Sequence, residues 1–232
     1  MKKVKSTVTI YSPMTYEEAI KRTILAARNC YQSFDNSTPE SDIKLIEHLA
    51  MSGHTSITEQ TFLQFKVNIP NGIHLEWVRH RTGQSHAAES SRWNRYSNDK
   101  FGHQLTVVEP LFFNNKPEVA KVWQDACEYM ENAYMKMLYL GATPQEAASV
   151  LNKSLKTSDV ISANFTGLKS FFNQRCTKHA HPEIRSVALA MLKWCHETYP
   201  AFFKTTYNKF QIEYDRIQSE NYSLAEIDVV SL

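Results

Sequence analysis

The chain lacks the glycine-rich loops that usually hold nucleotides. Only 6 of its 232 residues are glycine, and neither a GxGxxG nor a GxxxxGK[ST] pattern occurs. Both patterns serve to bring backbone N–H groups close to a phosphate. A Rossmann or P-loop type of nucleotide site is therefore not expected, and any nucleotide or dinucleotide must be held in another way.

Cysteine is also scarce and poorly spaced for chemistry. The four cysteines are Cys30, Cys127, Cys176 and Cys195. They form no CxxC pair, which argues against a zinc or thioredoxin-type motif. Arg175 could lower the pKa of the adjacent Cys176 thiol, but one such neighbour favours a structural cysteine over a nucleophile. His179 and His181 have no third ligand at suitable spacing, so we expect no metal.

Neither charge nor hydropathy indicates a nucleic acid or a membrane as partner. Lysine and arginine number 26 against 24 acidic residues, a net charge of +2, so there is no general basic field. No apolar run approaches the roughly 18 residues of a membrane span, and the polar N-terminus does not resemble a signal peptide. We expect a cytoplasmic protein with reduced thiols, folded as a single domain over residues 1–232.

The segment 79–93 is rich in arginine, histidine and serine. Within fifteen residues it carries three arginines, two histidines and three serines, and its only carboxylate is Glu89. Guanidinium groups are planar and always charged, so a cluster of them suits a phosphate or another delocalised anion. A surface loop paired with acidic side chains is the alternative, but the density of arginine beside serine favours an anion site.

Hydrophobic periodicity predicts a mixed α/β protein. Alternation predicts strands over 4–11 and 61–69. Helical spacing and capping signals predict helices over 15–31, 38–53, 72–79, 117–140, from 143 onward, 161–176 and, as the last long helix, 182–199. Residues 94–117 are expected to be loop with short extended pieces. The buried side of the helix 117–140 is predicted to be Val119, Val122, Trp123, Ala126, Met130, Ala133 and Met137.

Two further clusters of polar residues are candidates for binding. Gly53–Glu59 places donors and acceptors in a predicted loop, although a capped, solvated turn is the simpler interpretation of this segment alone. The second cluster follows helical steps of three and four residues: Asn164, Leu168, Phe171, Arg175 and His179. This stripe would form half of a pocket for a flat ligand, or a core helix whose polar groups have internal partners.

In combination, these segments resemble the flavin-dependent thymidylate synthases. That family is marked by Arg-His-Arg, seven or eight residues, and then Ser-x-Arg; here 79–81 is followed by eight residues and by 90–92. Its Gly-His-x-Ser/Thr-x-x-Glu loop is similar to 53–59, and its Asn, Arg and His near the C-terminus are similar to Asn164, Arg175 and His179. The resemblance extends, in order, over most of the chain.

The resemblance implies a fold and an activity. The fold would be α/β, an antiparallel sheet flanked by long helices, like that of the thymidylate synthase complementing proteins and assembled as a homotetramer with shared sites. The activity would be reductive methylation of dUMP to dTMP. Methylenetetrahydrofolate would supply the carbon, FAD the hydride and NADPH the reducing power, without an enzymatic cysteine nucleophile.

The resemblance also implies roles for individual residues. Arg175 would be catalytic, by contacting the uracil and favouring its N3-deprotonated form. The residues implied for dUMP are Glu76, Arg79, Ser90, Ser91, Arg92 and Arg175. The residues implied for FAD are His54, Ser56, Arg79, His80, Arg81, Asn164 and His179.

Two departures from the family pattern keep other functions open. The stretch 147–152 lacks the arginine that many members carry, and Thr166 stands where many have arginine two residues after the asparagine. Lys153, Lys156 or Lys169 could replace these cations. The alternatives are hydroxymethylation of dUMP, action on another pyrimidine nucleotide, or a nucleotide- or RNA-binding module without turnover.

Overall fold

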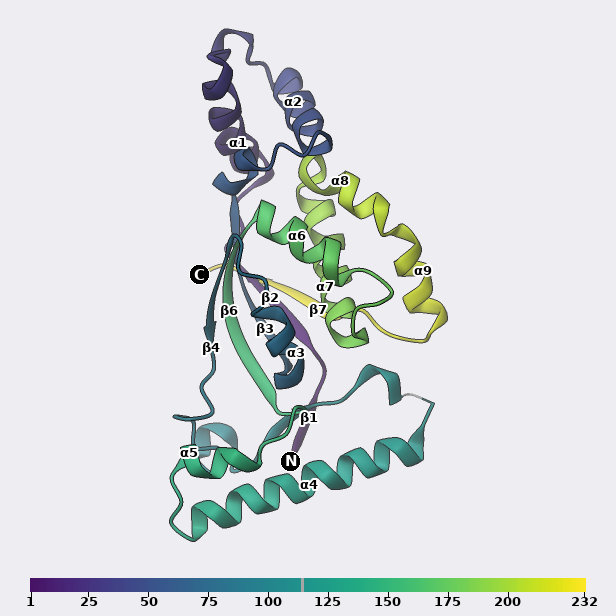
Figure 1. The fold of residues 1–232 in the computed structure, drawn as a ribbon. Coiled ribbons are helices and arrows are strands. Elements are labelled where there is room, and N and C mark those ends of the chain that lie inside the picture. The colour runs from purple at the N-terminus through teal and green to yellow at the C-terminus, as the bar shows by residue number, and fades with distance from the viewer. Residues whose placement is uncertain (114) are drawn as a thin grey trace.

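A five-stranded sheet forms the centre of the computed structural model, which describes residues 1–113 and 115–232 (Figure 1). Its strand order is β4-β6-β3-β2-β7. The strands are β2 (Thr7–Tyr11), β3 (Phe62–Pro70), β4 (Gln84–Ala88), β6 (Lys156–Asn164) and β7 (Glu226–Val230). A second sheet consists of two parallel strands, β1 (Lys2–Val4) and β5 (Thr106–Val108).

The sheet is mixed rather than antiparallel. β4, β6, β3 and β2 pair antiparallel, as expected, but β7 runs parallel to β2. The expected antiparallel sheet is thus wrong at this edge, because the chain returns through helices after residue 182 before it adds its last strand. The α/β class itself is confirmed.

The core-facing residues of β3 were correctly predicted. Leu63, Phe65, Val67 and Ile69 are all buried and alternate with more exposed neighbours. The predicted strand 4–11 is interrupted after Val4, so its two halves, β1 and β2, belong to different sheets.

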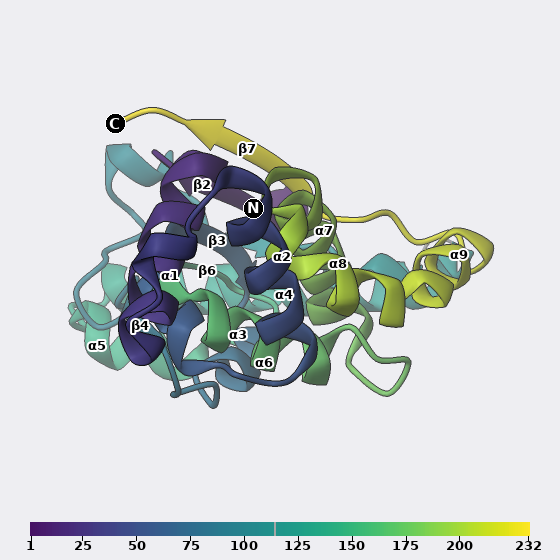
Figure 2. The same cartoon turned by 90° about the horizontal axis from the view of Figure 1, so that it is seen from above.

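Helices cover one face of the sheet and both ends of the molecule (Figures 1 and 2). The α-helices are α1 (Tyr16–Tyr31), α2 (Pro39–Met51), α3 (Asn71–Trp77), α4 (Pro117–Tyr139), α5 (Pro144–Ala147), α6 (Phe165–Arg175), α7 (Pro182–Thr198), α8 (Pro200–Lys209) and α9 (Gln211–Ser219). Short 3-10 helices span Phe34–Asn36, Ser56–Gln60, Asp99–Phe101, Leu111–Phe113 and Ala148–Val150. Helices α3, α6 and α7 contact the sheet, and the main core lies between them and its strands.

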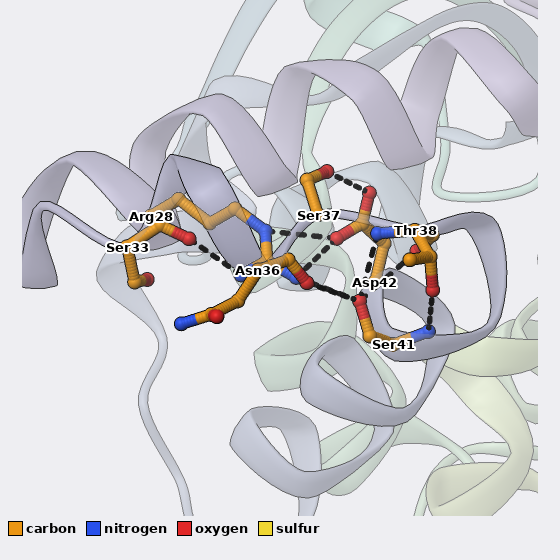
Figure 3. A network of polar contacts seen from close by, with 7 residues as sticks. All are labelled: Arg28, Ser33, Asn36, Ser37, Thr38, Ser41 and Asp42. Atoms are coloured by element: carbon orange, nitrogen blue, oxygen red, sulfur yellow. Dashed lines mark hydrogen bonds and ion pairs between the residues drawn. The ribbon is translucent and has the colours of Figure 1, made fainter.

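A buried arginine fastens α1 to α2 (Figure 3). Arg28, which is 4% exposed, donates from Nε and Nη2 to one carboxylate oxygen of Asp42. Its other N–H groups reach the carbonyl of Ser33 and the hydroxyl of Ser41. Because the charge is both paired and hydrogen-bonded, its burial is tolerated, and the two helices form a rigid hairpin.

The long helix α4 builds a second, smaller core at the end of the molecule near β1 (Figure 1). Its buried positions are Cys127, Met130, Tyr134 and Leu138. The predicted face is correct at Met130 but wrong at Val119 and Val122, which are 48% and 70% exposed. The first turns of α4 project beyond the core. The helical spacing of apolar residues in these turns therefore does not indicate that their side chains are buried.

Three further boundaries differ from the sequence prediction. Residues 161–164 end strand β6, and the helix begins only at Phe165. The helix expected to reach Arg79 ends at Trp77, and Pro182–Thr198 is followed by α8, α9 and β7 rather than being the last helix. The expected loop 94–117 contains β5 and two 3-10 helices; Asn114 within it lies outside the described residues. In the described part of the chain, no helix has the length and apolarity needed to cross a membrane.

Candidate active site

The Arg-His-Arg segment packs directly against the start of α6. The side-chain oxygen of Asn164 caps α6 by accepting from the Gly167 N–H at 2.7 Å, and the Asn164 N–H donates to the Gly83 carbonyl at 2.8 Å. Gly83 has φ +66°, and a Cβ there would lie 2.3 Å from the Asn164 amide oxygen. A Cβ on Gly167 would lie 2.7 Å from the Thr82 carbonyl. Both glycines are therefore required for this close approach.

Aromatic packing fixes the other end of the same segment. The Trp77 ring stacks on Phe171 of α6 with centroids 4.3 Å apart, and the His80 ring meets Phe171 edge-on at 5.1 Å. Trp77 Nε1 donates to Gln84, whose own amide donates to the Gly167 carbonyl. Residues 77–84 are thus held along α6 from its first turn to its last.

Arg175 lies at the centre of this arrangement. It ends α6, and its Nε donates to His80 Nε2 at 2.8 Å. Its Nη1 donates to a Glu76 carboxylate oxygen at 2.7 Å, and its Nη2 donates to the Glu76 carbonyl at 3.1 Å. Glu76 and Arg175 were both implied for dUMP and His80 for FAD, and the structure brings these three residues together. The arginine side chain remains 20% exposed, so part of its guanidinium can reach a ligand.

His80 is neutral in this setting. Burial and the adjacent Arg175 guanidinium lower the pKa of His80 to about 4. Since Nε2 accepts the hydrogen bond from Arg175, the ring proton must sit on Nδ1. His80 thus orients the guanidinium as an acceptor and adds no positive charge to the site.

The exposed cations of the segment fall into two groups rather than one. Arg79 and Arg81 precede β4, whereas Ser90, Ser91 and Arg92 follow it. The five residues of β4 separate the two groups by roughly 13–17 Å. The strand therefore keeps the two groups apart within one chain. Within residues 1–113 and 115–232, no carboxylate forms an ion pair with Arg79, Arg81 or Arg92.

Glu89 and Lys156 hold the second group in place. The Glu89 carboxylate pairs with Lys156 at 2.5 Å and accepts from the Tyr96 hydroxyl, while the Glu89 N–H donates to the Ser158 carbonyl. Lys156 is one of the lysines that could replace a missing arginine. Its charge is already paired with the Glu89 carboxylate. Arg92 lies over the exposed Trp93 ring, 5.1 Å from its centroid.

The His54 loop reaches the same end of α6 through Thr166. Thr166 Oγ1 donates to the Thr55 carbonyl at 2.7 Å and lies 2.8 Å from the Thr58 hydroxyl. His54 and Ser56 are exposed on this loop, close in space to the α6 cap. The contribution of Thr166 was missed in the sequence, where only the absence of an arginine was evident.

His179 is less closely associated with the site. Helix α6 ends at Arg175, so the predicted stripe leaves the helix there and His179 lies exposed in the turn before α7. The remainder of the stripe is confirmed in part: Leu168 and Phe171 are fully buried, and Asn164 is the cap of α6 rather than a residue within it.

Two cavities border the site. One of about 240 Å³ is lined by Glu76, Lys153, His181 and Glu183 among others. Another of about 470 Å³ lies between α2, α6 and α8, and Gly53, Thr55, Thr166 and Lys169 contribute to its walls. Burial lowers the pKa of Lys169 to about 8. Lys153 and Lys169 therefore each place a positive charge in the wall of one of these two cavities.

Cys176, next to Arg175 in the chain, and Cys195 are both buried. Cys176 is fully buried, and burial, followed by the charge of Glu213, raises the pKa of its thiol well above the usual value. Burial likewise raises the pKa of Cys195. Thiols that resist ionisation are poor nucleophiles, which agrees with the structural role expected for Cys176.

Comparison with known proteins assigns the chain to a family. The family model described as thymidylate synthase complementing protein matches residues 14–201. The chain belongs to this family. It is 30% identical to the flavin-dependent thymidylate synthase of Thermotoga neapolitana over 179 residues, which cover 72% of this chain and 79% of that protein. The enzymes of the same name from Kosmotoga olearia and Mycolicibacterium vanbaalenii are 29% and 27% identical, over 74% and 77% of this chain and 80% and 76% of theirs. The family inferred from the sequence motifs is thus confirmed.

Proposed function

We propose that the protein is a flavin-dependent thymidylate synthase that converts dUMP to dTMP. Methylenetetrahydrofolate would donate the carbon, NADPH would be the reductant, and bound FAD would supply the hydride. Family membership supports the reaction class. The burial of Cys176 supports a route without an enzymatic thiol, because no ionisable cysteine lies beside Arg175 in the described residues.

The geometry of Arg175 is the observation that carries this proposal. A guanidinium has five N–H donors. In Arg175 three of them contact His80, the Glu76 carboxylate and the Glu76 carbonyl. Two N–H groups, one on each terminal nitrogen, remain for a ligand. Such a pair suits the planar edge of a pyrimidine and would stabilise the charge left when N3 loses its proton, which makes C5 nucleophilic.

The cofactor would lie at the first turn of α6. Arg79, Arg81, His54 and Ser56 are exposed on the two segments that contact α6, and together they would supply a donor set that fits the phosphates of FAD. The chemistry that bound FAD supplies is hydride transfer. His80 would act by holding Arg175 rather than by transferring a proton. His179, exposed beyond α6, would meet the cofactor only at its edge.

The second group of cations supports a site shared between chains. Ser90, Ser91 and Arg92 follow β4, at the opposite end of that strand from Arg81. We propose that they bind the dUMP phosphate in a neighbouring subunit, as in a homotetramer. Within one chain, Lys153 lines the cavity beside Glu76 and would take over the charge of the arginine missing from 147–152.

Thr166 is the observation that favours a second function. It stands where many members carry an arginine, and its hydroxyl is engaged with Thr55 and Thr58. With one cation fewer near the cofactor, hydroxymethylation of dUMP or modification of another pyrimidine nucleotide is the alternative reaction.

Anaerobic turnover with product mass determination tests the proposal. Protein carrying FAD, supplied with dUMP, methylenetetrahydrofolate and NADPH, should yield a product heavier than dUMP by one methylene unit. A product that also retains an oxygen would indicate hydroxymethylation. A colourless protein that binds no flavin but binds RNA would refute both enzyme activities. Sedimentation should show a tetramer, and a monomer that binds FAD tightly would overturn the shared site.

A further inference from the structure

Two histidines and an aspartate meet beneath the sheet edge, outside the residues discussed so far. His74 lies on α3, His86 on β4 and Asp159 on β6. His74 Nε2 and His86 Nδ1 lie 3.0 Å and 2.7 Å from the same carboxylate oxygen of Asp159. One ligand atom from each residue can be chosen so that all three lie within 4.8 Å of one another.

Asp159 occupies a position that a hydrophobic side chain would ordinarily fill. It lies on the same, core-facing side of β6 as Thr157, Ile161 and Ala163, and it is fully buried. Burying a carboxylate is costly unless it is paired or hydrogen-bonded. Its second oxygen accepts the Ala87 N–H at 2.9 Å, so the two imidazoles converge on a single oxygen.

The arrangement brings three metal-binding atoms together, His74 Nε2, His86 Nδ1 and one carboxylate oxygen of Asp159. A single serine or backbone donor would satisfy the Asp159 oxygen with less burial of polar atoms. Two imidazole nitrogens aimed at one carboxylate oxygen are instead the donor set of a His₂-carboxylate metal site that leaves a fourth position open.

We propose that His74, His86 and Asp159 bind a divalent late transition-metal ion, Zn²⁺ in the first instance, with a water molecule as fourth ligand. Imidazole nitrogen and carboxylate oxygen suit zinc, at about 2.0–2.2 Å from the ion. Ligand atoms in such a tetrahedron are about 3.3 Å apart, so the present contacts need to open by a few tenths of an ångström. Each neutral imidazole would keep its proton on the nitrogen that faces away from the ion.

The cluster is accessible enough to take up an ion. The side chains of His74 and His86 are 12% and 18% exposed, whereas Asp159 is fully enclosed. An ion would therefore enter from the imidazole side. Once bound, it would fasten α3, β4 and β6 to one another, and with them the segment that carries Glu76 and the Arg-His-Arg motif. This proposal is independent of the activity proposed above.

Equilibrium dialysis of untagged protein with ZnCl₂, followed by elemental analysis, tests the site. All variants carry Cys30→Ser, because that exposed thiol is itself a zinc ligand. We expect one zinc per chain. Asp159→Asn and His86→Gln should each weaken binding at least about a hundredfold, since even changes outside the ligand shell cost about 10–100-fold. His103→Gln is the matched control, because His103 also pairs with an aspartate, Asp99, but at the surface.

A second measurement needs no substitution of a proposed ligand and remains informative if a ligand variant fails to fold. Diethylpyrocarbonate modifies free imidazoles, and peptide mass spectrometry locates the product. Zinc should protect His74 and His86 in the Cys30→Ser protein while His103 stays reactive. The proposal is overturned if zinc does not bind in stoichiometric amount, if binding survives His86→Gln and Asp159→Asn, or if zinc leaves the reactivity of His74 and His86 unchanged.

Discussion

The neutral His80 beside Arg175 makes the stability of the protein depend on pH in a defined direction. In the unfolded chain this histidine takes up a proton near its ordinary pKa of 6.5, but in the folded protein only near 4. Between these values the unfolded state binds more protons, so the free energy of unfolding falls as pH falls. This contribution is fully present above pH 6.5 and is lost by pH 4.

The size of the effect follows from the two pKa values. Between pH 7 and pH 5, His80 alone should lower the free energy of unfolding by about 2 kcal/mol. His80→Gln is the reference, because the glutamine oxygen can accept the Arg175 hydrogen bond but does not titrate. Other titrating groups are common to both proteins and cancel in the comparison.

Urea unfolding at pH 7 and pH 5, at one fixed protein concentration, measures the difference. The wild-type protein should lose about 2 kcal/mol more than His80→Gln over this interval. An NMR titration of the His80 ring should show a midpoint near pH 4. Equal losses in the two proteins, or a midpoint near 6.5, would mean that His80 is not buried against Arg175 as described.

Substitutions at six other positions probe the site and its support. Arg175→Ala should lower kcat by about a hundred- to a thousandfold, with partial recovery in Arg175→Lys, whereas Arg92→Ala should mainly raise the KM for dUMP; near-normal turnover of Arg175→Ala at saturating dUMP would contradict its role. Cys176→Ala should keep turnover within about tenfold, and complete loss in a folded variant would restore a thiol nucleophile. Gly167→Ala should cost about 1–3 kcal/mol in thermal or urea unfolding, since its Cβ would meet backbone oxygens under 3 Å away; an unchanged midpoint would refute that contact. Arg28→Ala should cost about 3–5 kcal/mol in the same assay because it leaves Asp42 unpaired, and Arg28→Ala with Asp42→Ala should cost less than the sum of the two single changes.

Elements marked by local signals could be predicted from the sequence. Thr15 and Glu18 form the capping box that opens α1, and Thr143 and Glu146 form the one that opens α5. Each box needs only residues three apart, so it can be recognised without tertiary information. The same holds for the regular alternation of β3.

Elements that depend on tertiary pairing could not be located in this way. β6 carries Asp159 at a core position, which interrupts its apolar alternation, and its end was assigned to the following helix. β4 is a polar edge strand hidden in the arginine-rich segment, and only its pairing with β6 reveals it. The cluster of His74, His86 and Asp159 was missed for the same reason, since the register of these strands brings together residues far apart in sequence.

Within the candidate site, residue types were easier to predict than their grouping. Family motifs named Glu76, His80 and Arg175, but only the structure shows that Arg175 contacts both of the others. The separation of Arg81 from Arg92 was not expected, because the intervening residues gave no strand signal. A motif thus reports which side chains take part, whereas the sheet decides which of them can meet within one chain.

The departure at Thr166 shows how the fold accommodates the loss of a cation. An arginine at this position would project charge toward a ligand, whereas the Thr166 hydroxyl holds the Thr55 carbonyl and the Thr58 hydroxyl of the His54 loop. The loop is thereby fixed by the chain itself before any ligand arrives, which lowers the entropy lost on binding. In the FAD site proposed above, charge toward the anion would fall to Arg79 and Arg81, which have no carboxylate partner in the described residues. The affinity of that proposed site for its cofactor should depend on these two arginines more strongly than the affinity of a site with three cations would.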